Sequence, residues 1–413
     1  MEKSDLESRI SGIFRKSLFS DFVVEELNYS DNRNKGKEYA DLLFIFGNVL
    51  IVFQAKTRIV KDESSIENGI EIKRIESRIE EAIGQIKSSL NQLRLNEIVR
   101  LRTVRGYMID LEFTRLTKVI CIVVIDAQSK SGASLVNKME IINGFQEKYE
   151  VPIHIFKVSD LEVIVNELDT FPDLYEYLEI REKVMSMNKL AYYSGELDLL
   201  ATYIFEREAL DDAMSDEMTK LVIEPGKWEF LQQNSSDEEY RDYIRTSYCI
   251  DEIIDFLHAS VGFRVRDEMS TDYEGSVEGY LKAAYELGRL NRVTRQRIAE
   301  ILIGKARKAA TEGYGYTFVV IEQIASSIVL LSFGGERAER RRLLYSLSAS
   351  AYCALDIIAK GVTCNKVIGI ATNPINCPTP SYDVLVVENI NFGNADELRD
   401  QAFRYFDLGD RKV

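Results

Sequence analysis

The sequence predicts an α/β protein with three parts: an αβββαβ core at the N-terminus, a helical middle segment and a small C-terminal α/β domain. A helix-period stretch followed by apolar, strand-like runs predicts the core. Long helix-period stretches after residue 160 predict the middle segment, and the return of strand-like runs after residue 313 predicts the last domain. The corresponding boundaries are 1–160, 161–312 and 313–413.

The core elements follow from the spacing of apolar residues. Leu6, Ile10 and Phe14 recur at helical intervals, and apolar residues from Ile72 to Leu93 form one stripe of a long helix. Gly47-Asn48 separates two apolar runs by only two residues, which predicts a tight hairpin. The predicted elements are a helix at 4–18, strands at 22–27, 39–46 and 49–56, a helix around 72–93, a strand at 119–126, a helix at 136–147 and a strand at 152–158.

The C-terminal domain is predicted from four apolar runs of strand length. They lie at 316–322, 327–333, 366–372 and 382–388, and a helix at 337–359 separates the second from the third. Arginine-rich helices cover 276–312 before the first run. "IGIATNPINCPTPSYD" (368–383) includes a proline-bearing loop, which could line a pocket or serve only as a connection.

Composition favours a cytoplasmic protein without a membrane segment. The longest apolar stretch, from Leu42 to Phe53, is interrupted by Gly47-Asn48 and is shorter than the ~20 residues of a membrane helix. The first ten residues contain no apolar core of a signal peptide. The five cysteines are scattered and never spaced as CxxC, which is typical of a reducing compartment and gives no zinc framework.

The net charge of −15 is confined to one region of the chain. Lysine and arginine balance aspartate and glutamate in residues 1–160, whereas residues 161–270 carry −16 and residues 271–413 carry +1. The negative net charge of the middle segment argues against nucleic acid as its partner. The balanced N-terminal part remains compatible with a local basic groove for nucleic acid.

Polar residues close both ends of the apolar hairpin. Gln54 and Lys56 are two residues apart and therefore share one face of a strand. The two-residue turn places Asp41, at the start of the other strand, opposite position 54. An acidic residue, a second oxygen ligand and a lysine are the groups that hold Mg²⁺ against a phosphodiester and stabilise the charge that develops during hydrolysis.

The string "EYAD", the residues 42–53 and then "QAK" together resemble the PD-(D/E)XK nuclease superfamily, in the variant with glutamine at the D/E position. The αβββαβ order is also the core of this superfamily's restriction-endonuclease-like fold, and the resemblance covers residues 4–126 and at most 1–160. It implies that Asp41 is the metal-binding aspartate, Gln54 the second ligand through its amide oxygen and Lys56 the catalytic lysine. The implied cofactor is Mg²⁺, with Mn²⁺ as a substitute.

Three further residues have two interpretations each. Glu7 lies within the apolar face of the first helix, where superfamily members often carry a metal-linked glutamate, but it also fits a boundary residue turned outward. Glu38 lies three residues before Asp41, which places it on the other face of a regular strand. It would serve as a metal ligand only if the strand starts late or bulges. Gln85 resembles the glutamine that some subfamilies place beside the lysine, and it also fits an ordinary polar helix position.

Two functions remain open from the sequence. The first is a metal-dependent endonuclease, a hydrolase acting on DNA, in bacterial restriction or anti-phage defence, as the resemblance implies. The alternative is a catalytically inactive, nuclease-like module for nucleic-acid binding or assembly with a C-terminal sensor domain, which the neutral Gln54 favours. Other expected partners are a second copy of the chain in a homodimer or larger homo-oligomer, and a protein or ligand at the C-terminal domain.

Overall fold

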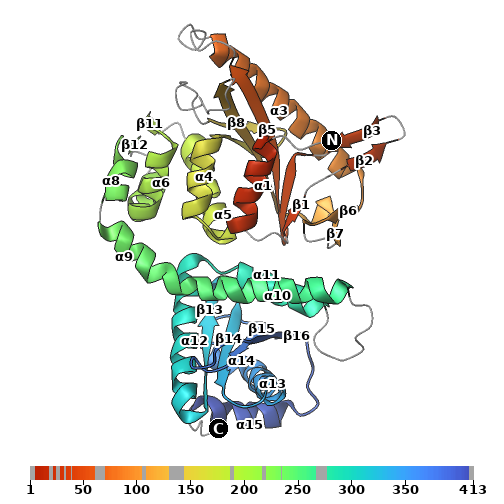
Figure 1. Cartoon of the computed structure of the whole chain (residues 1–413), viewed down its shortest axis with the longest axis vertical. Coiled ribbons are helices and arrows are strands. Elements are labelled where there is room, and N and C mark those ends of the chain that lie inside the picture. The colour runs from red at the N-terminus through yellow and green to blue at the C-terminus, as the bar shows by residue number, and fades with distance from the viewer. Residues whose placement is uncertain are drawn as a thin grey trace. The chain divides into compact units, whose positions relative to one another are not determined.

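The structure is a computed structural model of a mixed α/β protein. The chain forms two units, Met1–Asp237 and Glu238–Val413, which are described separately (Figure 1). The structure describes residues 5–17, 22–24, 28–31, 34–38, 40–60, 70–104, 108–129, 144–186, 190–215, 220–233, 235–266 and 277–408.

A six-stranded sheet forms the centre of the first unit. Its central strands β5, β8 and β10 are parallel to one another. Strand β4 pairs antiparallel with β5, β9 pairs antiparallel with β10, and β1 pairs antiparallel with β4. The twelve-residue β5 pairs along its whole length with β8. In spatial order the strands are β1 (Val23–Val24), β4 (Leu42–Phe46), β5 (Val49–Val60), β8 (Lys118–Ser129), β10 (Val151–Lys157) and β9 (Gly144–Lys148).

The predicted hairpin is confirmed as β4 and β5. Phe46 pairs with Val49 and Leu42 with Phe53, so the register continues to place Asp41 opposite Gln54. Gly47 has a φ of 59°, a left-handed conformation at the first central turn position that glycine adopts without steric cost. The strands differ from their predicted bounds, because β4 begins at Leu42 rather than at 39 and β5 continues to Val60.

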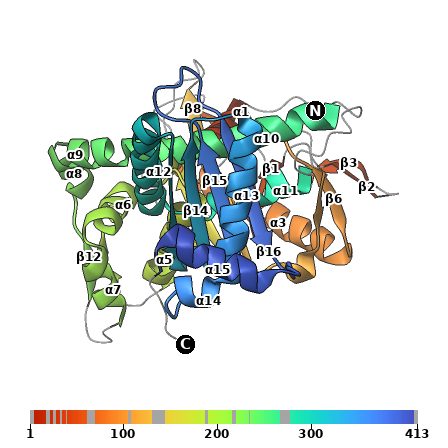
Figure 2. The ribbon, with the colours of Figure 1, turned by 90° about the horizontal axis from the view of Figure 1, so that it is seen from below.

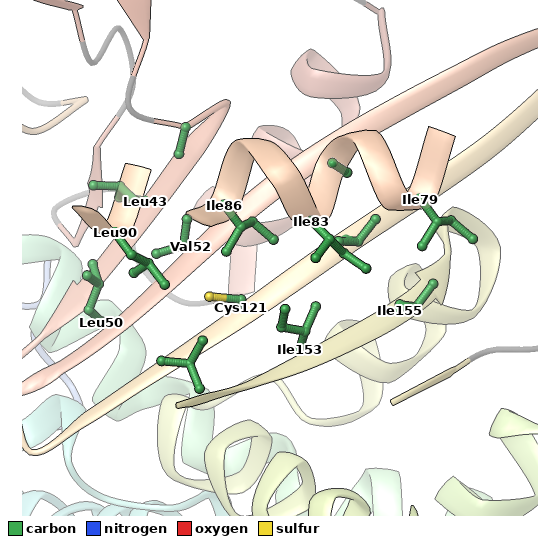
Figure 3. Packing of buried hydrophobic residues seen from close by; sticks show 14 of the residues in the cluster. Leu43, Leu50, Val52, Ile79, Ile83, Ile86, Leu90, Cys121, Ile153 and Ile155 are labelled. Atoms are coloured by element: carbon green, nitrogen blue, oxygen red, sulfur yellow. The ribbon is translucent and has the colours of Figure 1, made fainter. Parts of the chain in front are cut away.

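The long helix α3 (Ile70–Leu95) covers one face of this sheet. Its buried stripe includes Ile79, Ile83, Ile86 and Leu90. Figure 3 shows these side chains pointing toward residues of the strands, among them Leu50, Val52, Cys121 and Ile153. Each fully buried aliphatic side chain of this kind contributes about 1.5–3 kcal/mol relative to exposure.

The other face of the sheet is covered by α1 (Asp5–Ser17), α4 (Val158–Glu167) and α5 (Phe171–Ser186). Phe14 of α1 packs on Phe53, with ring centroids 4.6 Å apart. Phe171, at the start of α5, stacks on Phe44 at 5.3 Å. Alternate residues of the β4–β5 hairpin therefore face α3 on one side and these helices on the other.

The predicted helix at 136–147 is wrong for its last residues. Residues 144–148 form strand β9, which pairs antiparallel with β10, whereas the earlier part of the prediction lies outside the described residues. Phe145 packs edge-on against His154 of β10, and Gly144 allows the close approach of Ile155. Tertiary pairing at the sheet edge outweighs the local helical pattern here.

Three small two-stranded sheets accompany the main sheet. The pair β2–β3 precedes the β4–β5 hairpin, β6–β7 follows α3, and β11–β12 links the later helices. Their strands are β2 (Asn28–Asp31), β3 (Asn34–Glu38), β6 (Val99–Arg102), β7 (Met108–Leu111), β11 (Leu190–Tyr193) and β12 (Leu221–Ile223).

Further helices complete the first unit and lead into the second. They are α6 (Glu196–Phe205), α7 (Arg207–Ser215), α8 (Lys227–Gln233) and α9 (Ser235–Ile244). Short 3-10 turns lie at Phe113–Arg115, Arg245–Ser247 and Glu322–Ile324. No helix within the described ranges has an apolar stretch of the length that a membrane span requires.

A fully buried charge cluster fixes α5 and α6 to the sheet. Arg181 of α5 donates from Nε to Glu196 Oε1 at 2.8 Å and from a terminal nitrogen to Oε2 at 3.0 Å. The hydroxyls of Tyr177 and Tyr193 donate to the same carboxylate. Burial, and then the neighbouring Arg181, hold the pKa of His154 well below its usual range. The neutral His154 ring therefore accepts from Arg181 at 2.9 Å.

The second unit is built on a four-stranded sheet, which confirms the four predicted C-terminal strands. Its central strands β14 and β15 are parallel, and each pairs antiparallel with an outer strand. The strands are β13 (Tyr314–Ile321), β14 (Ser326–Phe333), β15 (Lys366–Thr372) and β16 (Tyr382–Glu388). The helices are α10 (Tyr248–Arg266), α11 (Val277–Gly288), α12 (Arg292–Glu312), α13 (Arg337–Cys353), α14 (Leu355–Ile358) and α15 (Ala395–Phe406).

Helices cover both faces of this second sheet. Helix α13 packs on β14 and β15 with α15 beside it (Figure 2). Helix α12 packs on β13 and β14, and α10 and α11 pack against β16. Asp383 of β16 fixes the start of α13, because the guanidinium groups of Arg337, Arg340 and Arg341 all donate to its carboxylate.

The predicted middle segment 161–312 is divided between the two units. Its first helix, α4, packs on α1, β8 and β10 in the first unit. Its last helix, α12, packs on β13 and β14 in the second unit. Residues of the acidic stretch 161–270 therefore contribute to both units.

The buried charge cluster predicts a large effect of one neutral substitution. Glu196→Gln keeps the shape of the side chain but leaves the Arg181 guanidinium buried without a counterion. We expect the free energy of unfolding to fall by about 3–5 kcal/mol in urea titrations. Glu206→Gln, which removes a half-exposed partner of Lys227, is the matched control and should cost less than about 1 kcal/mol. Equal losses in the two variants would contradict the assigned role.

Candidate active site

The carboxylate of Asp41 lies at the open end of the β4–β5 hairpin. The Asp41 amide donates to the Phe53 carbonyl at 3.2 Å, which continues the strand pairing by one residue. The Ala55 amide donates to Asp41 Oδ2 at 2.6 Å. The carboxylate is therefore held against the main chain of β5, between Gln54 and Lys56.

Three polar side chains continue the apolar face of β5 beneath α3. Leu50 and Val52 belong to the core under this helix, and alternation puts Gln54, Lys56 and Arg58 on the same face. Gln54 is 4% exposed. The Lys56 side chain is 16% exposed. The face thus changes from apolar to polar where the Asp41 carboxylate meets the strand.

The first half of α3 provides acidic partners for the two basic side chains. Lys56 Nζ lies 3.5 Å from Glu81 Oε1, and Arg58 Nε donates to Glu71 Oε2 at 2.8 Å. Arg74 also donates to Glu71, whose side chain is only 1% exposed. The polar part of β5 is therefore matched by charge on α3, as its apolar part is matched by isoleucines.

The contacts with basic side chains lower the pKa of both Glu71 and Glu81. The hydrogen bond from Arg58 is the main cause that lowers the pKa of Glu71 below its ordinary value, against the opposing effect of burial. The hydrogen bond from Arg78, followed by the charge of Lys56, lowers the pKa of Glu81. Both carboxylates are ionised at neutral pH, so Lys56 has a charged neighbour.

The structure does not bring the other sequence-predicted residues together with Asp41, Gln54 and Lys56. Glu7 lies on α1, the helix that covers the Phe53 face, opposite to the face of Gln54 and Lys56. Glu38 is the last residue of β3 and pairs with Asn28 in a separate sheet. Gln85 is exposed on α3, one turn after Glu81.

Sequence reasoning missed three acids near the polar part of β5, namely Glu71, Glu81 and Asp126. Glu71 precedes Ile75 and Ile79 at four-residue intervals, so it extends the buried stripe of α3, and this spacing is the signal for it. Asp126, 1% exposed, lies beside Thr57 on the face away from α3 and accepts from Gln128 Nε2 at 2.7 Å. No local pattern in the sequence distinguishes Glu81 from the other acids of α3.

Asp41 and Gln54 are the oxygen ligands that this face offers to a cation. Within the described ranges, no group of three or more His, Cys, Asp or Glu side chains is placed to hold a metal ion. Mg²⁺ does not require such a group, because it commonly binds through one or two carboxylates, waters and the phosphates of a substrate. The donor set therefore fits Mg²⁺ if the substrate supplies phosphate oxygens.

The Arg58–Glu71 pair predicts a pH-dependent contribution to stability. Glu71→Gln should lower the free energy of unfolding by about 1–3 kcal/mol at pH 7, because a buried, charge-assisted hydrogen bond is lost. The folded-state pKa of Glu71 is lowered, so the difference should be complete above the ordinary carboxyl value of 4.5 and shrink as the pH falls below it. The midpoints of urea unfolding of wild type and Glu71→Gln, at pH 7 and at pH 4, measure this difference in stability. Glu80→Gln, an exposed position on α3, is the control, and a difference independent of pH would contradict the assignment.

Comparison with known proteins assigns the chain to no family. No family model matches it, and no curated protein and no solved structure matches it. The chemistry of the site therefore follows from its own residues and their geometry.

Proposed function

We propose that the first unit is a metal-dependent endonuclease that hydrolyses phosphodiester bonds in DNA. The observation that carries this proposal is the meeting of Asp41, Gln54 and Lys56 at the open end of one hairpin. The carboxylate is held against the strand between the other two residues, and the lysine is mostly buried beside it. These are the residue types and the order of the motif in the PD-(D/E)XK superfamily.

The arrangement of elements around the hairpin supports the same proposal. Leaving aside the small β2–β3 and β6–β7 sheets and the 3-10 turn at Phe113–Arg115, the order α1, β1, β4, β5, α3, β8 corresponds to the αβββαβ core of a restriction-endonuclease-like fold. One helix lies on each side of the strands that carry the motif. Such a fold presents both motif strands in the middle of a rigid sheet, which is how catalytic groups keep their geometry. A role in bacterial restriction or anti-phage defence rests on the superfamily resemblance.

Each residue has a defined role in this mechanism. Asp41 and Gln54 would hold a divalent cation together with an oxygen of the scissile phosphate. The cation, when bound, neutralises charge on the phosphate and increases the acidity of water. Lys56 Nζ, a donor that carries a positive charge, positions the attacking water and stabilises the negative charge that develops on the phosphate. Glu81 is a positioning residue, because it fixes the direction of the Lys56 side chain.

The proposal predicts cleavage that depends on both the metal and the lysine. Plasmid, linear and single-stranded DNA, with RNA in parallel, would be incubated with the full chain in Mg²⁺, Mn²⁺ or EDTA. We expect cutting in Mg²⁺ or Mn²⁺ and none in EDTA, and we expect Lys56→Ala and Asp41→Asn to reduce the rate by about 100-fold or more.

Lys148→Ala is the matched control for the lysine. Lys148 also extends from a strand of the same sheet to a glutamate of α3, Glu80, at 3.1 Å, but it lies away from the hairpin. The Lys148→Ala variant should cleave DNA at the wild-type rate. Equal activity of wild type and Lys56→Ala would overturn the assignment of the lysine, and equal activity in EDTA would overturn the requirement for metal.

A second candidate function is an inactive, nuclease-like module that binds nucleic acid or assembles with a partner. The observation that favours it is that Asp41 Oδ2 already accepts from the Ala55 amide, while Gln54 is neutral and 4% exposed. Calorimetric titration with Mn²⁺ distinguishes the two. The inactive module should bind Mn²⁺ no better than its Asp41→Ala variant, whereas the nuclease should bind it more tightly.

A further inference from the structure

We propose that the second unit contains a binding site for a small, neutral, six-membered ring that carries hydrogen-bonding groups. The site is a cavity of about 150 Å³ between α10, α12 and the loop that follows β15. This inference concerns Glu238–Val413 and does not depend on the nuclease activity proposed for the first unit.

The walls of the cavity are uncharged and mainly aliphatic. Leu302, Ile303 and Ala306 of α12 form one side, and prolines and Ile375 of the loop form another. Among the described residues, no Asp, Glu, Lys, Arg or His lines it. A charged ligand would lose its hydration without gaining a counterion, which is costly in an apolar site. The cavity therefore selects a neutral ligand.

One end of the cavity is polar. Thr372 and Asn373 line it where β15 ends, and Ser332 of β14 pairs with Thr372 in the parallel register, so the two hydroxyl-bearing residues share one face of the sheet. The Ser332 hydroxyl is fully buried and has no hydrogen-bond partner among the described residues. Ser332 lies behind the lining, and the Thr372 hydroxyl, which donates to Asn373 Oδ1 at 3.3 Å, keeps its lone pairs to accept from a ligand at this end. The carboxyl ends of parallel strands are also a common position for ligands in open α/β sheets.

The loop that closes the cavity is fixed by its own hydrogen bonds. Asn373 donates from Nδ2 to the Thr379 carbonyl at 2.8 Å and accepts from the Ser381 amide at 3.0 Å. The Ile375 amide donates to the Ala306 carbonyl of α12 at 3.3 Å. These bonds hold the loop in place, so binding does not require the loop to be ordered first.

The volume sets the size of the ligand. An engineered apolar cavity of about 150 Å³ in another protein binds benzene, so this cavity has room for one six-membered ring. The ring must be neutral and apolar on its faces, with a polar group at its edge. Phenol, with one polar group, and uracil, with carbonyl and N–H groups along most of its edge, are neutral probes of this kind, and benzene is the six-membered ring without a polar group.

Cysteine alkylation reports on occupancy of the cavity. Cys377 and Cys249 line it, whereas Cys353 and Cys364 of the same unit do not. Burial raises the pKa of Cys249 to about 11, which slows its alkylation, so Cys377 is followed as the reporter. The full chain would be alkylated with iodoacetamide, with and without each probe, and the rate at each cysteine followed by peptide mass spectrometry. Saturating phenol or uracil should slow Cys377 by about fivefold or more, and should leave Cys353 and Cys364 unchanged.

Two variants test the assigned groups. Ala306→Leu fills the cavity from α12 and should abolish the protection of Cys377 by all three probes. Thr372→Val removes a hydroxyl at nearly constant volume, so it should weaken protection by phenol and uracil by about fivefold and leave protection by benzene unchanged. The second variant remains informative if the first fails to fold. Absence of protection by every probe, or equal protection of all four cysteines, would overturn the proposal.

Discussion

The register of β4 against β5 is the constraint on which the rest of the first unit depends. The turn at Gly47 and Asn48 fixes it, and a slip by one residue would move every side chain of one strand to the opposite face. In the observed register the aromatic residues face α1 and α5, the aliphatic residues face α3, and Asp41 meets β5 between Gln54 and Lys56. Core packing and the candidate site are therefore specified by the same turn.

The candidate site and the core share one face of one strand. Along β5 the face under α3 changes from Leu50 and Val52 to Gln54 and Lys56, and the basic side chains of this polar part pair with acids of α3. Burying the lysine without Glu81 would be unfavourable, so the ion pair is part of what allows a charged side chain at this depth. The apolar end holds the sheet and helix rigid, and a rigid support is what a catalytic constellation requires.

Much of the fold, and the residues at the end of the hairpin, could be predicted from local sequence. The hairpin, the stripe of α3 and the C-terminal strands follow from periodicity and turn residues, because each is decided within a short window of the chain. Local sequence could not predict strand β9 or the partners of Lys56 and Arg58, because these depend on residues far apart in sequence. Pairing with β10 decides the strand at 144–148, and only the docked position of α3 selects Glu81.

The central claim is that the open end of the hairpin binds a divalent cation through Asp41 and Gln54. A Mg²⁺ titration of DNA cleavage by wild type and Gln54→Glu tests it most directly, because a carboxylate at position 54 adds a charged ligand without moving the main chain. The account predicts that both proteins cut and that Gln54→Glu needs about tenfold less Mg²⁺ for half-maximal rate. Cleavage by neither protein, or an unchanged Mg²⁺ dependence, would contradict it.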